Sequence, residues 1–345
     1  MKLQKKIFSC VLAACVLAGV MTGCGGSAAS SGAESSSAAE KSSSTVPEKT
    51  PMKIATLKGP TGMGMLKLMS DNDAKTAGSY YQFTIVGSPD EIVSKISTGE
   101  IDAASVPTNL AAVLYNKTKG KVQLAAINTL GVLSVLTNGE TVSSMKDLKG
   151  KTIYASGQGS IPEYALNYIL KQNGLEPGKD VNIEYKAEHA ELAALVISGK
   201  AKIALLPEPF VTQVLSKNKD VKLALNITKE WEKAVNGKSV LSMGGLLVRK
   251  DFAEKNKSAF NQFLDEYKAS TAYTDSNLEQ TAALSEKYGI MPSAIAKKAI
   301  PNCNIVYIDG TEMKKQIPDF LKILYAANPK SVGGALPGDD FYYTK

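Results

Sequence analysis

Three glycines stand within the segment Gly59–Gly64, which reads GPTGMG and follows an apolar run. A glycine-rich turn from a strand into a helix directs main-chain N–H groups, and the positive end of the helix, at a phosphate. A phosphate-binding P-loop continues with Lys and then Ser or Thr, whereas Met65 and Leu66 follow here. The dinucleotide pattern G-x-G-x-x-G starts at Gly62 and fails at Lys67. The segment does not match a nucleotide site, but it suits a small ligand held by main-chain N–H groups.

Few residues suited to catalysis or metal binding occur in the sequence. His189 is the only histidine, and neither a His-Glu-x-x-His nor a Gly-x-Ser-x-Gly motif is present. No carboxylates stand at a spacing that would complete a metal site with His189. We therefore expect no metal, no cofactor and no enzymatic activity. An extracellular enzyme or an adhesion module is the less favoured alternative.

The first residues predict export from the cytoplasm. Three lysines lie in Met1–Lys6, an apolar run covers Ile7–Met21, and small residues follow, which is typical of a secretory signal peptide over residues 1–23. The run is shorter than the roughly 20 residues of a membrane span. The segment Val20–Cys24, VMTGC, resembles a lipoprotein signal box. Cys24 would then be lipidated and would anchor the protein outside the cytoplasm, on a Gram-positive surface or in a periplasm. A second box, Leu12–Cys15, would leave too short an apolar region.

Residues 24–50 are predicted to be a lipidated cysteine followed by a tether. The segment is rich in Ser, Ala and Gly and holds too few apolar side chains to fold. As a flexible chain it would reach roughly 25–30 Å. Cys10 and Cys15 leave with the signal peptide and Cys24 carries lipid, so only Cys303 remains. We expect no disulfide, and Cys303 as a small buried hydrophobic residue.

The charge of the sequence argues against nucleic acid as a partner. The formal net charge of +7 falls to +4 without Lys2, Lys5 and Lys6, and the remaining lysines are scattered singly among acidic residues. A nucleic-acid-binding domain instead carries Lys and Arg in a stripe or patch. About 295 residues follow the tether and 44% of the chain is apolar, which is enough for two lobes.

Short apolar runs alternate with helical patterns after residue 52, which predicts an α/β fold with mostly parallel strands. The predicted strands are Lys53–Leu57, Tyr81–Val86, Ala103–Val106, Thr152–Ala155, Asn182–Tyr185 and Ile203–Leu206. Beyond Phe252 the chain is predicted to be helical, with amphipathic runs at FNQFLDEYKASTAY and QIPDFLKILYAAN.

A weak internal repeat has an offset near one hundred residues. Ile96–Asn109 aligns with Val196–Pro209, and each segment reads as a helix end, a glycine turn, a short strand and a proline before the next helix. Two upstream segments match in the same order, so one βα arrangement is built twice, over 53–115 and 151–215. Ser88 and Ser160 are each followed three residues later by Glu, which predicts two capping boxes.

Two such halves predict two lobes with their strand ends at a shared cleft, because open α/β sheets bind ligands at the carboxyl ends of their strands. Gly244–Val248 is predicted to be a strand that returns the chain and pairs near Ser134. Lobe one would comprise residues 52–136 and 244–345, and lobe two residues 137–243.

Several segments together resemble the solute-binding proteins of ABC importers, in the branch that handles nitrate, sulfonates and taurine and includes binders of thiamine-related pyrimidines. They are KGPTGMGMLKLM, SPDEIVSKISTGEIDAASVPTNLAAVLY, DLKGKTIYASGQGSIPEYALNYILKQNGLEP and EHAELAALVISGKAKIALLPEPFVTQVL. The resemblance implies a type II periplasmic-binding-protein-like fold with a two-strand hinge. It also implies a monomer that delivers its ligand to a membrane permease driven by a cytoplasmic ATPase.

Ligand positions carried over from that family fall at the ends of the predicted strands. They are Lys58, Gly59, Thr61, Gly62, Met63, Ser88, Ser105, Pro107 and Thr108 in lobe one, Ser134 near the crossing, and Gly157, Gln158, Gly159, Ser160, His189, Pro207 and Glu208 in lobe two. Two helix N-termini would converge on the ligand, which favours a small anionic group. For a flat heterocycle the candidate stacking partners are Tyr154, Tyr164, Phe210 and Trp231.

Glu208 leaves two interpretations open. Its carboxylate could complement a helix N-terminus. If it faces the cleft, it would repel a simple anion and suit a ligand amine, so that a zwitterion such as taurine, or an aminopyrimidine, would fit better than nitrate.

Overall fold

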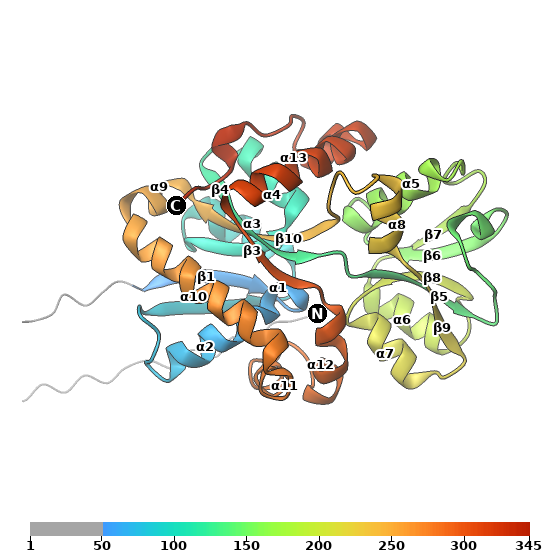
Figure 1. The fold of residues 1–345 in the computed structure, drawn as a ribbon, viewed down its shortest axis with the longest axis horizontal. Helices are drawn as coiled ribbons and strands as arrows, with labels where there is room; N and C mark the ends of the chain where they lie inside the picture. Colours follow the sequence, from blue (N-terminus) through green and yellow to red (C-terminus); the bar gives the residue numbers. More distant parts are fainter. Residues whose placement is uncertain (1–50) are drawn as a thin grey trace, which may run out of the picture. The chain divides into compact units, whose positions relative to one another are not determined.

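Two mixed β-sheets form the framework of residues 51–345, the part of the chain that this computed structural model describes (Figure 1). The first sheet has the order β11-β4-β10-β3-β1-β2, and the second has the order β7-β6-β8-β5-β9. The strands are β1 Met52–Leu57, β2 Tyr81–Val86, β3 Ala103–Pro107, β4 Val122–Leu130, β5 Leu133–Asn138, β6 Thr152–Ser156, β7 Asn182–Lys186, β8 Ile203–Pro207, β9 Val221–Asn226, β10 Ser242–Arg249 and β11 Ile305–Ile308. The predicted signal peptide, Cys24 and tether lie outside the described residues.

The internal repeat is confirmed by the strand order of the two sheets. β1 pairs in parallel with β2 and β3, and β6 pairs in parallel with β7 and β8. Gly99 and Gly199, aligned by the repeat, have positive φ angles of 77° and 75° after their helices. All six predicted strands are present, and the fold is of the predicted α/β class.

The chain crosses between the sheets twice. The first crossing runs from β4 through Gly131 and Val132 into β5, and the second returns from the second sheet into β10. The predicted strand after the second crossing is present as β10 and rejoins the first sheet, but it pairs antiparallel with β3 and β4 and not with the residues around Ser134. Ser134 instead pairs with Leu206 and Asn226 inside the second sheet, where β5 lies between β8 and β9. Each sheet therefore incorporates one strand that follows a crossing.

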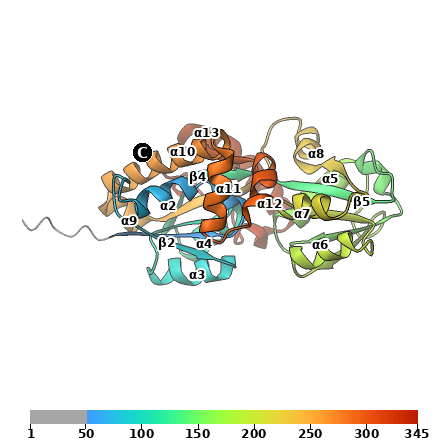
Figure 2. The same ribbon diagram turned by 90° about the horizontal axis from the view of Figure 1, so that it is seen from below.

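Helices cover both sheets (Figures 1 and 2), and α1, α3, α4, α5, α6 and α7 begin at the ends of the parallel strands. They are α1 Pro60–Met63, α2 Leu66–Asp73, α3 Pro89–Thr98, α4 Thr108–Lys117, α5 Ile161–Gln172, α6 His189–Ile197, α7 Phe210–Lys217, α8 Ile227–Ala234, α9 Lys250–Lys255, α10 Lys257–Ser276, α11 Leu278–Lys287, α12 Ser293–Ala299 and α13 Gly310–Ala327, with short 3-10 turns at Met145–Leu148, Ile300–Asn302, Pro329–Val332 and Asp339–Phe341. The two amphipathic runs predicted near the C-terminus form α10 and α13. The strand β11 between them was not predicted.

Both capping boxes differ from the prediction. Ser88 caps α3 by accepting a hydrogen bond from the N–H of Asp90 at 3.2 Å, without a reciprocal bond from the glutamate. At α5 the hydroxyl of Ser160 donates to the carbonyl of Gly157, while Glu163 accepts from the N–H of Gly159 at 2.5 Å. The glutamate reaches one residue further back because the preceding turn is closed by Ser160 itself.

One apolar cluster runs from the first sheet into the second. Trp231 on α8 is fully buried within it, and its ring centroid lies 5.2 Å from that of Tyr168 on α5 and 5.8 Å from that of Phe320 on α13. The indole N–H donates to the carbonyl of Ser239. Cys303 is free and buried in a second cluster, as expected from the sequence. Trp231 is therefore a core residue, and the suggestion that it stacks on a ligand is wrong.

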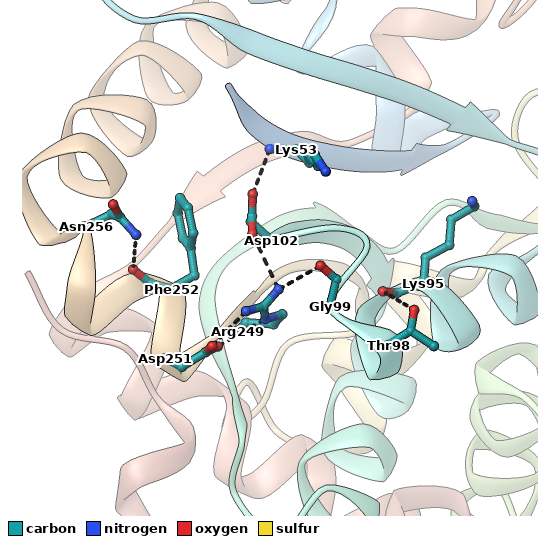
Figure 3. Close-up of polar contacts among 9 residues, drawn as sticks. All are labelled: Lys53, Lys95, Thr98, Gly99, Asp102, Arg249, Asp251, Phe252 and Asn256. Carbon is teal, nitrogen blue, oxygen red and sulfur yellow. Dashed lines mark hydrogen bonds and ion pairs between the residues drawn. The ribbon is translucent and has the colours of Figure 1, made fainter. Parts of the chain in front are cut away.

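The only arginine of the sequence fixes the end of β10 (Figure 3). Arg249 donates to the carbonyl of Gly99 at 2.9 Å and holds Asp251 through two hydrogen bonds, while Asp102 lies 3.6 Å away. Asp102 also accepts from the main-chain N–H of Lys53 at 2.9 Å. The network joins the beginnings of β1 and β3 to the last residue of β10, at the amino ends of the parallel strands. Within residues 51–345, none of the helices is long and apolar enough to span a membrane.

Candidate functional site

The carboxyl end of β1 turns tightly into a helix. The backbone angle φ of Gly59 is 124°, which residues other than glycine rarely adopt, and α1 starts at the next residue. A Cβ atom on Gly62 would lie 2.5 Å from the carbonyl oxygen of Leu57, so the helix packs directly on the strand that precedes it. Gly59 and Gly62, which were predicted as ligand contacts, thus allow the tight turn from β1 into α1. The side chain of Met63 is fully buried in the core and does not face the surface.

Buried hydroxyl groups follow at the carboxyl end of β3. Ser105 accepts a hydrogen bond from Nδ2 of Asn128 on β4 at 3.1 Å. The hydroxyl groups of Thr108 and Ser242 lie 2.7 Å apart, which joins the first residue of α4 to the first residue of β10. Thr61 contacts β10 as well, since a Cβ atom on Gly244 would lie 2.5 Å from its methyl group. The polar end of the first sheet is therefore tied to β4, which leads into the first crossing, and to β10, which follows the second.

The second sheet has a matching polar end, built around His189. Oγ of Ser156, at the end of β6, lies 2.6 Å from Nδ1 of His189, the first residue of α6. The ring of Phe210, the first residue of α7, lies 5.6 Å from the imidazole. Burial lowers the pKa of His189, and the nearby Glu188 carboxylate only partly offsets this effect. The imidazole is consequently neutral at neutral pH and can donate or accept one hydrogen bond.

Gln158 and Gly159 precede α5 and line a hollow of about 860 Å³ between α5 and the C-terminal half of α13. Tyr164 and Tyr168 form part of its wall, and the hydroxyl of Tyr164 accepts a hydrogen bond from Nδ2 of Asn328 at 3.3 Å. Tyr164 is buried, with 8% of its surface exposed, so it offers little area for a ligand ring to stack on.

Ser134 and Glu208 line a different hollow, of about 370 Å³, beside the first crossing. Glu208 is 6% exposed, and its Oε2 accepts a hydrogen bond from the N–H of Thr212 in the first turn of α7 at 3.1 Å. Burial raises the pKa of the Glu208 carboxyl, whereas the hydrogen bonds from Thr212 lower it. Glu208 thus caps the N-terminus of α7, as one of the two interpretations predicted, and it also lines this hollow.

The predicted residues accordingly fall into three groups. Lys58–Thr61, Ser88 and Ser105–Thr108 lie at strand and helix ends of the first sheet, Gly157–Ser160, His189 and Pro207 lie at those of the second, and Ser134 and Glu208 lie at the crossing. Sequence reasoning missed Thr56 and Ser156, which are both buried at strand ends. Their offset of one hundred residues continues the repeat, so the same alignment contained the signal.

Positive charge is scarce among these residues. Arg249 is engaged at the amino ends of the strands, and among the predicted ligand residues only Lys58 and His189 can carry a positive charge. Because the imidazole is held neutral, Lys58, the helix N-termini and the hydroxyl groups remain to stabilise an anion. No cluster of three or more His, Cys, Asp or Glu side chains suited to a metal ion occurs among residues 51–345.

The comparison with protein families decides the identity of the chain. The family described as "ABC transporter, phosphonate, periplasmic substrate-binding protein" matches residues 78–297, which is more than half of the sequence. The chain belongs to this family of periplasmic substrate-binding proteins. It is the solute-binding component of an ABC importer, as its resemblance to these proteins implied.

Solved structures of periplasmic binding proteins share the fold. A Parabacteroides distasonis ABC transporter protein matches with a TM-score of 0.73 and 24% identity, over 86% of this chain and 99% of that one. The periplasmic aliphatic sulphonate binding protein SsuA of Escherichia coli matches with a TM-score of 0.69 and 18% identity, over 85% and 92%. The nitrate-binding protein NrtA of Synechocystis PCC 6803 matches with a TM-score of 0.53 and 16% identity, over 72% and 69%. A search of curated protein sequences gives no match.

Proposed function

We propose that this binding protein captures a small solute whose oxyanion group carries a single negative charge, between the polar ends of its two sheets. One observation carries the proposal: the two sheets repeat the same strand order, and in each one the parallel strands end in helix starts and hydroxyl groups. Helix N-termini stabilise anions by roughly 0.3–1 kcal/mol each, and by about 2 kcal/mol where water is excluded. The two ends would close over the solute as lobes one and two, with the division predicted from the sequence.

The scarcity of cations favours a single negative charge. A doubly charged phosphonate would call for arginine or several lysines, and the only arginine is bound to Asp251 and Gly99. A sulfonate, nitrate or the sulfonate end of taurine carries one negative charge, which the helix N-termini can stabilise more easily than the two charges of a phosphonate. The family name mentions phosphonate, and SsuA and NrtA are named for sulphonate and nitrate, so all these ligands share an oxyanion head group.

A flat heterocycle such as a thiamine-precursor pyrimidine is the second candidate. The ring pair of His189 and Phe210 supports it, because both rings stand at helix starts of the second sheet and are tilted by 49° toward each other. Such a ligand would stack on Phe210 and accept or donate a hydrogen bond at the imidazole.

The remaining assignments follow from the sequence and the family. We propose that the protein works as a monomer, is held at the membrane by lipid on Cys24, and delivers its solute to a permease with a cytoplasmic ATPase. We do not expect it to turn over its ligand, since the family consists of binding proteins.

A thermal-shift screen tests the proposal. The purified protein is denatured to release any bound solute, refolded, and heated with methanesulfonate, taurine, nitrate, methylphosphonate or an aminopyrimidine. A ligand at a hundred times its dissociation constant should raise the free energy of unfolding by about 2.7 kcal/mol. We expect the largest shift from a monoanion. A larger shift with methylphosphonate at a pH where it is doubly charged would contradict the monoanion proposal, and chemical conversion of any candidate would contradict the binding role.

A further inference from the structure

The amino ends of the parallel strands of the second sheet carry many lysine side chains. We call this region the basic face, and it comprises residues 137–152, 171–182, 198–203 and 217–222. The N–H of Gly150 donates to the carbonyl of Asp180 at 2.7 Å, and the N–H of Asn138 donates to the carbonyl of Lys202 at 2.8 Å. Asn138 also pairs with Val221 at the start of β9. Lysines that are scattered singly along the sequence are thus gathered on one face of the fold.

The basic face carries the whole net charge of the part of the chain that the structure describes. It holds ten lysines and five acidic side chains, which is a net charge of +5. Residues 51–345 hold 35 basic and 30 acidic side chains in total, so those outside the basic face balance at 25 of each sign. Within residues 51–345 only two of the ten lysines form ion pairs, Lys151 with Glu140 and Lys171 with Glu176. The other eight can attract an anionic partner.

A hollow of about 260 Å³ opens within the basic face. Lys151, Lys200 and Lys202 line it, from the residues that lead into the adjacent strands β6 and β8. Its one acidic residue, Glu140, accepts a hydrogen bond from Lys151, whereas Lys200 and Lys202 are exposed and belong to the unpaired lysines. The volume far exceeds the roughly 30 Å³ that one water molecule occupies. A phosphate group therefore has room in the hollow and would meet ammonium groups from two strands.

The side chains that the basic face lacks narrow the kind of polyanion. Its four segments contain no arginine, so nothing in them binds a phosphate through two parallel hydrogen bonds. They contain no aromatic residue either, and Tyr154 in the wall of the hollow is half-buried with the ammonium group of Lys186 over its ring. Stacking on nucleic-acid bases thus has no partner here. None of the large exposed apolar side chains among residues 51–345 lies in these segments, which argues against insertion into a bilayer.

We propose that the basic face binds a linear polyanion of repeated phosphate groups, with one phosphate in the hollow and the next ones on the surrounding lysines. Lysine is a point charge on a flexible stem, which suits a flexible chain of phosphates without bases. The face lies at the amino ends of the strands whose carboxyl ends belong to the proposed solute site. The polymer would therefore hold the protein and leave the solute site accessible.

Fluorescence anisotropy with end-labelled inorganic polyphosphate tests the proposal on the purified protein. We expect saturable binding that weakens as salt is added, because phosphate contacts release counterions. The basic-face variant combines Lys200→Gln, Lys202→Gln and Lys222→Gln. It should bind about tenfold more weakly or worse, and its slope of log affinity against log salt should be smaller by about two, at about 0.7 for each lost contact.

The matched control has the same loss of charge outside the basic face. It combines Lys257→Gln, Lys298→Gln and Lys314→Gln, at exposed lysines that form no ion pair within residues 51–345. The control should bind polyphosphate within about twofold of the unaltered protein, since three contacts stay in place. Equal binding by the two triple variants would overturn the proposal, and so would a lack of polyphosphate binding at low salt.

Two further probes separate polyphosphate from other polyanions. Double-stranded DNA at equal phosphate concentration should bind more weakly than polyphosphate, and tighter binding of DNA would overturn the proposal. Binding to phosphatidylglycerol vesicles that the basic-face variant loses, without binding of polyphosphate, would overturn it as well. The basic-face variant should keep the thermal shift that the best solute of the anion screen produces. A failure of this proposal is therefore distinguishable from a failure of the proposed solute site.

Discussion

Nδ1 of His189 lies 2.6 Å from Oγ of Ser156, where α6 begins and β6 ends. This contact joins neighbouring strand ends of the second sheet through the only histidine of the chain. It also keeps the imidazole beside Phe210 and away from water, which explains why the pKa of His189 is lowered.

The stability of the protein should depend on His189 below neutral pH. Burial lowers the pKa of His189 in the folded state, so the unfolded chain binds the proton more readily. The contribution of this residue is therefore present above the ordinary histidine pKa of about 6.5 and is lost as the pH falls through the folded-state pKa. His189→Asn should show a smaller loss of unfolding free energy between about pH 7 and pH 5 than the unaltered protein. Urea titrations over this range measure the slope, and equal slopes would contradict the assignment.

Gly62→Ala should destabilise the protein because the new methyl group meets main chain. The added Cβ atom would lie 2.5 Å from the carbonyl oxygen of Leu57, which cannot move without shifting β1. We expect a loss of about 1–3 kcal/mol in the free energy of unfolding, as for other overpacked sites. Gly87→Ala is the matched control, since nothing lies within 4 Å of its added Cβ atom. A stability of Gly62→Ala equal to that of the control would show that α1 does not pack on β1 in this way.

Trp231→Ala should remove the centre of the aromatic contact between α5, α8 and α13. The side chain is fully buried against Tyr168 and Phe320, so its loss should lower the free energy of unfolding by about 3–5 kcal/mol. Ligand affinity measured by calorimetry, at a temperature where the variant stays folded, should change little. Tyr80→Ala, at a residue that is 58% exposed, is the control and should change the stability by less than about 0.5 kcal/mol. A selective loss of ligand binding in Trp231→Ala would show that this residue contributes to the binding site.

Arg249→Lys should be less stable than the unaltered protein although the charge is kept. Lysine cannot bind Asp251 through two parallel bonds and reach the carbonyl of Gly99 at the same time. We expect a loss of about 1.5–3 kcal/mol in chemical denaturation, the range for hydrogen bonds that involve charged groups. Lys250→Ala, the next residue along the chain, serves as the control. Equal stability of Arg249→Lys and the unaltered protein would mean that the network in Figure 3 adds nothing to the fold.

Much of the fold was predictable because strands and helices of the repeat carry local signals. Glycine turns such as Gly99 and Gly199 and short apolar runs mark the element ends, and the offset of one hundred residues identified both halves. The pairing partners of the strands were harder to predict. The pairing of β10 with β4 depends on contacts far apart in the sequence. The strand β11 is only four residues long and lies between helices, so the amphipathic helical runs on either side outweighed the turn residues that flank it.

The site was predictable in position and less so in role. The predicted strand ends identified Ser105, Thr108 and His189. Only the structure shows that Ser105 is hydrogen-bonded to β4 and Thr108 to β10, the two strands next to the crossings. Glu208 illustrates the limit. Its place before a helix predicted the hydrogen bond to α7. The hollow that it also faces is closed in part by Pro301, Asn302 and Asn304, which lie about ninety positions further along the chain.

Small-angle X-ray scattering with and without a saturating ligand from the thermal-shift screen tests the central claim most directly. If the solute binds between the polar ends of the two sheets, saturation should reduce the radius of gyration as the lobes close. An unchanged radius of gyration at full saturation would contradict binding between the sheets.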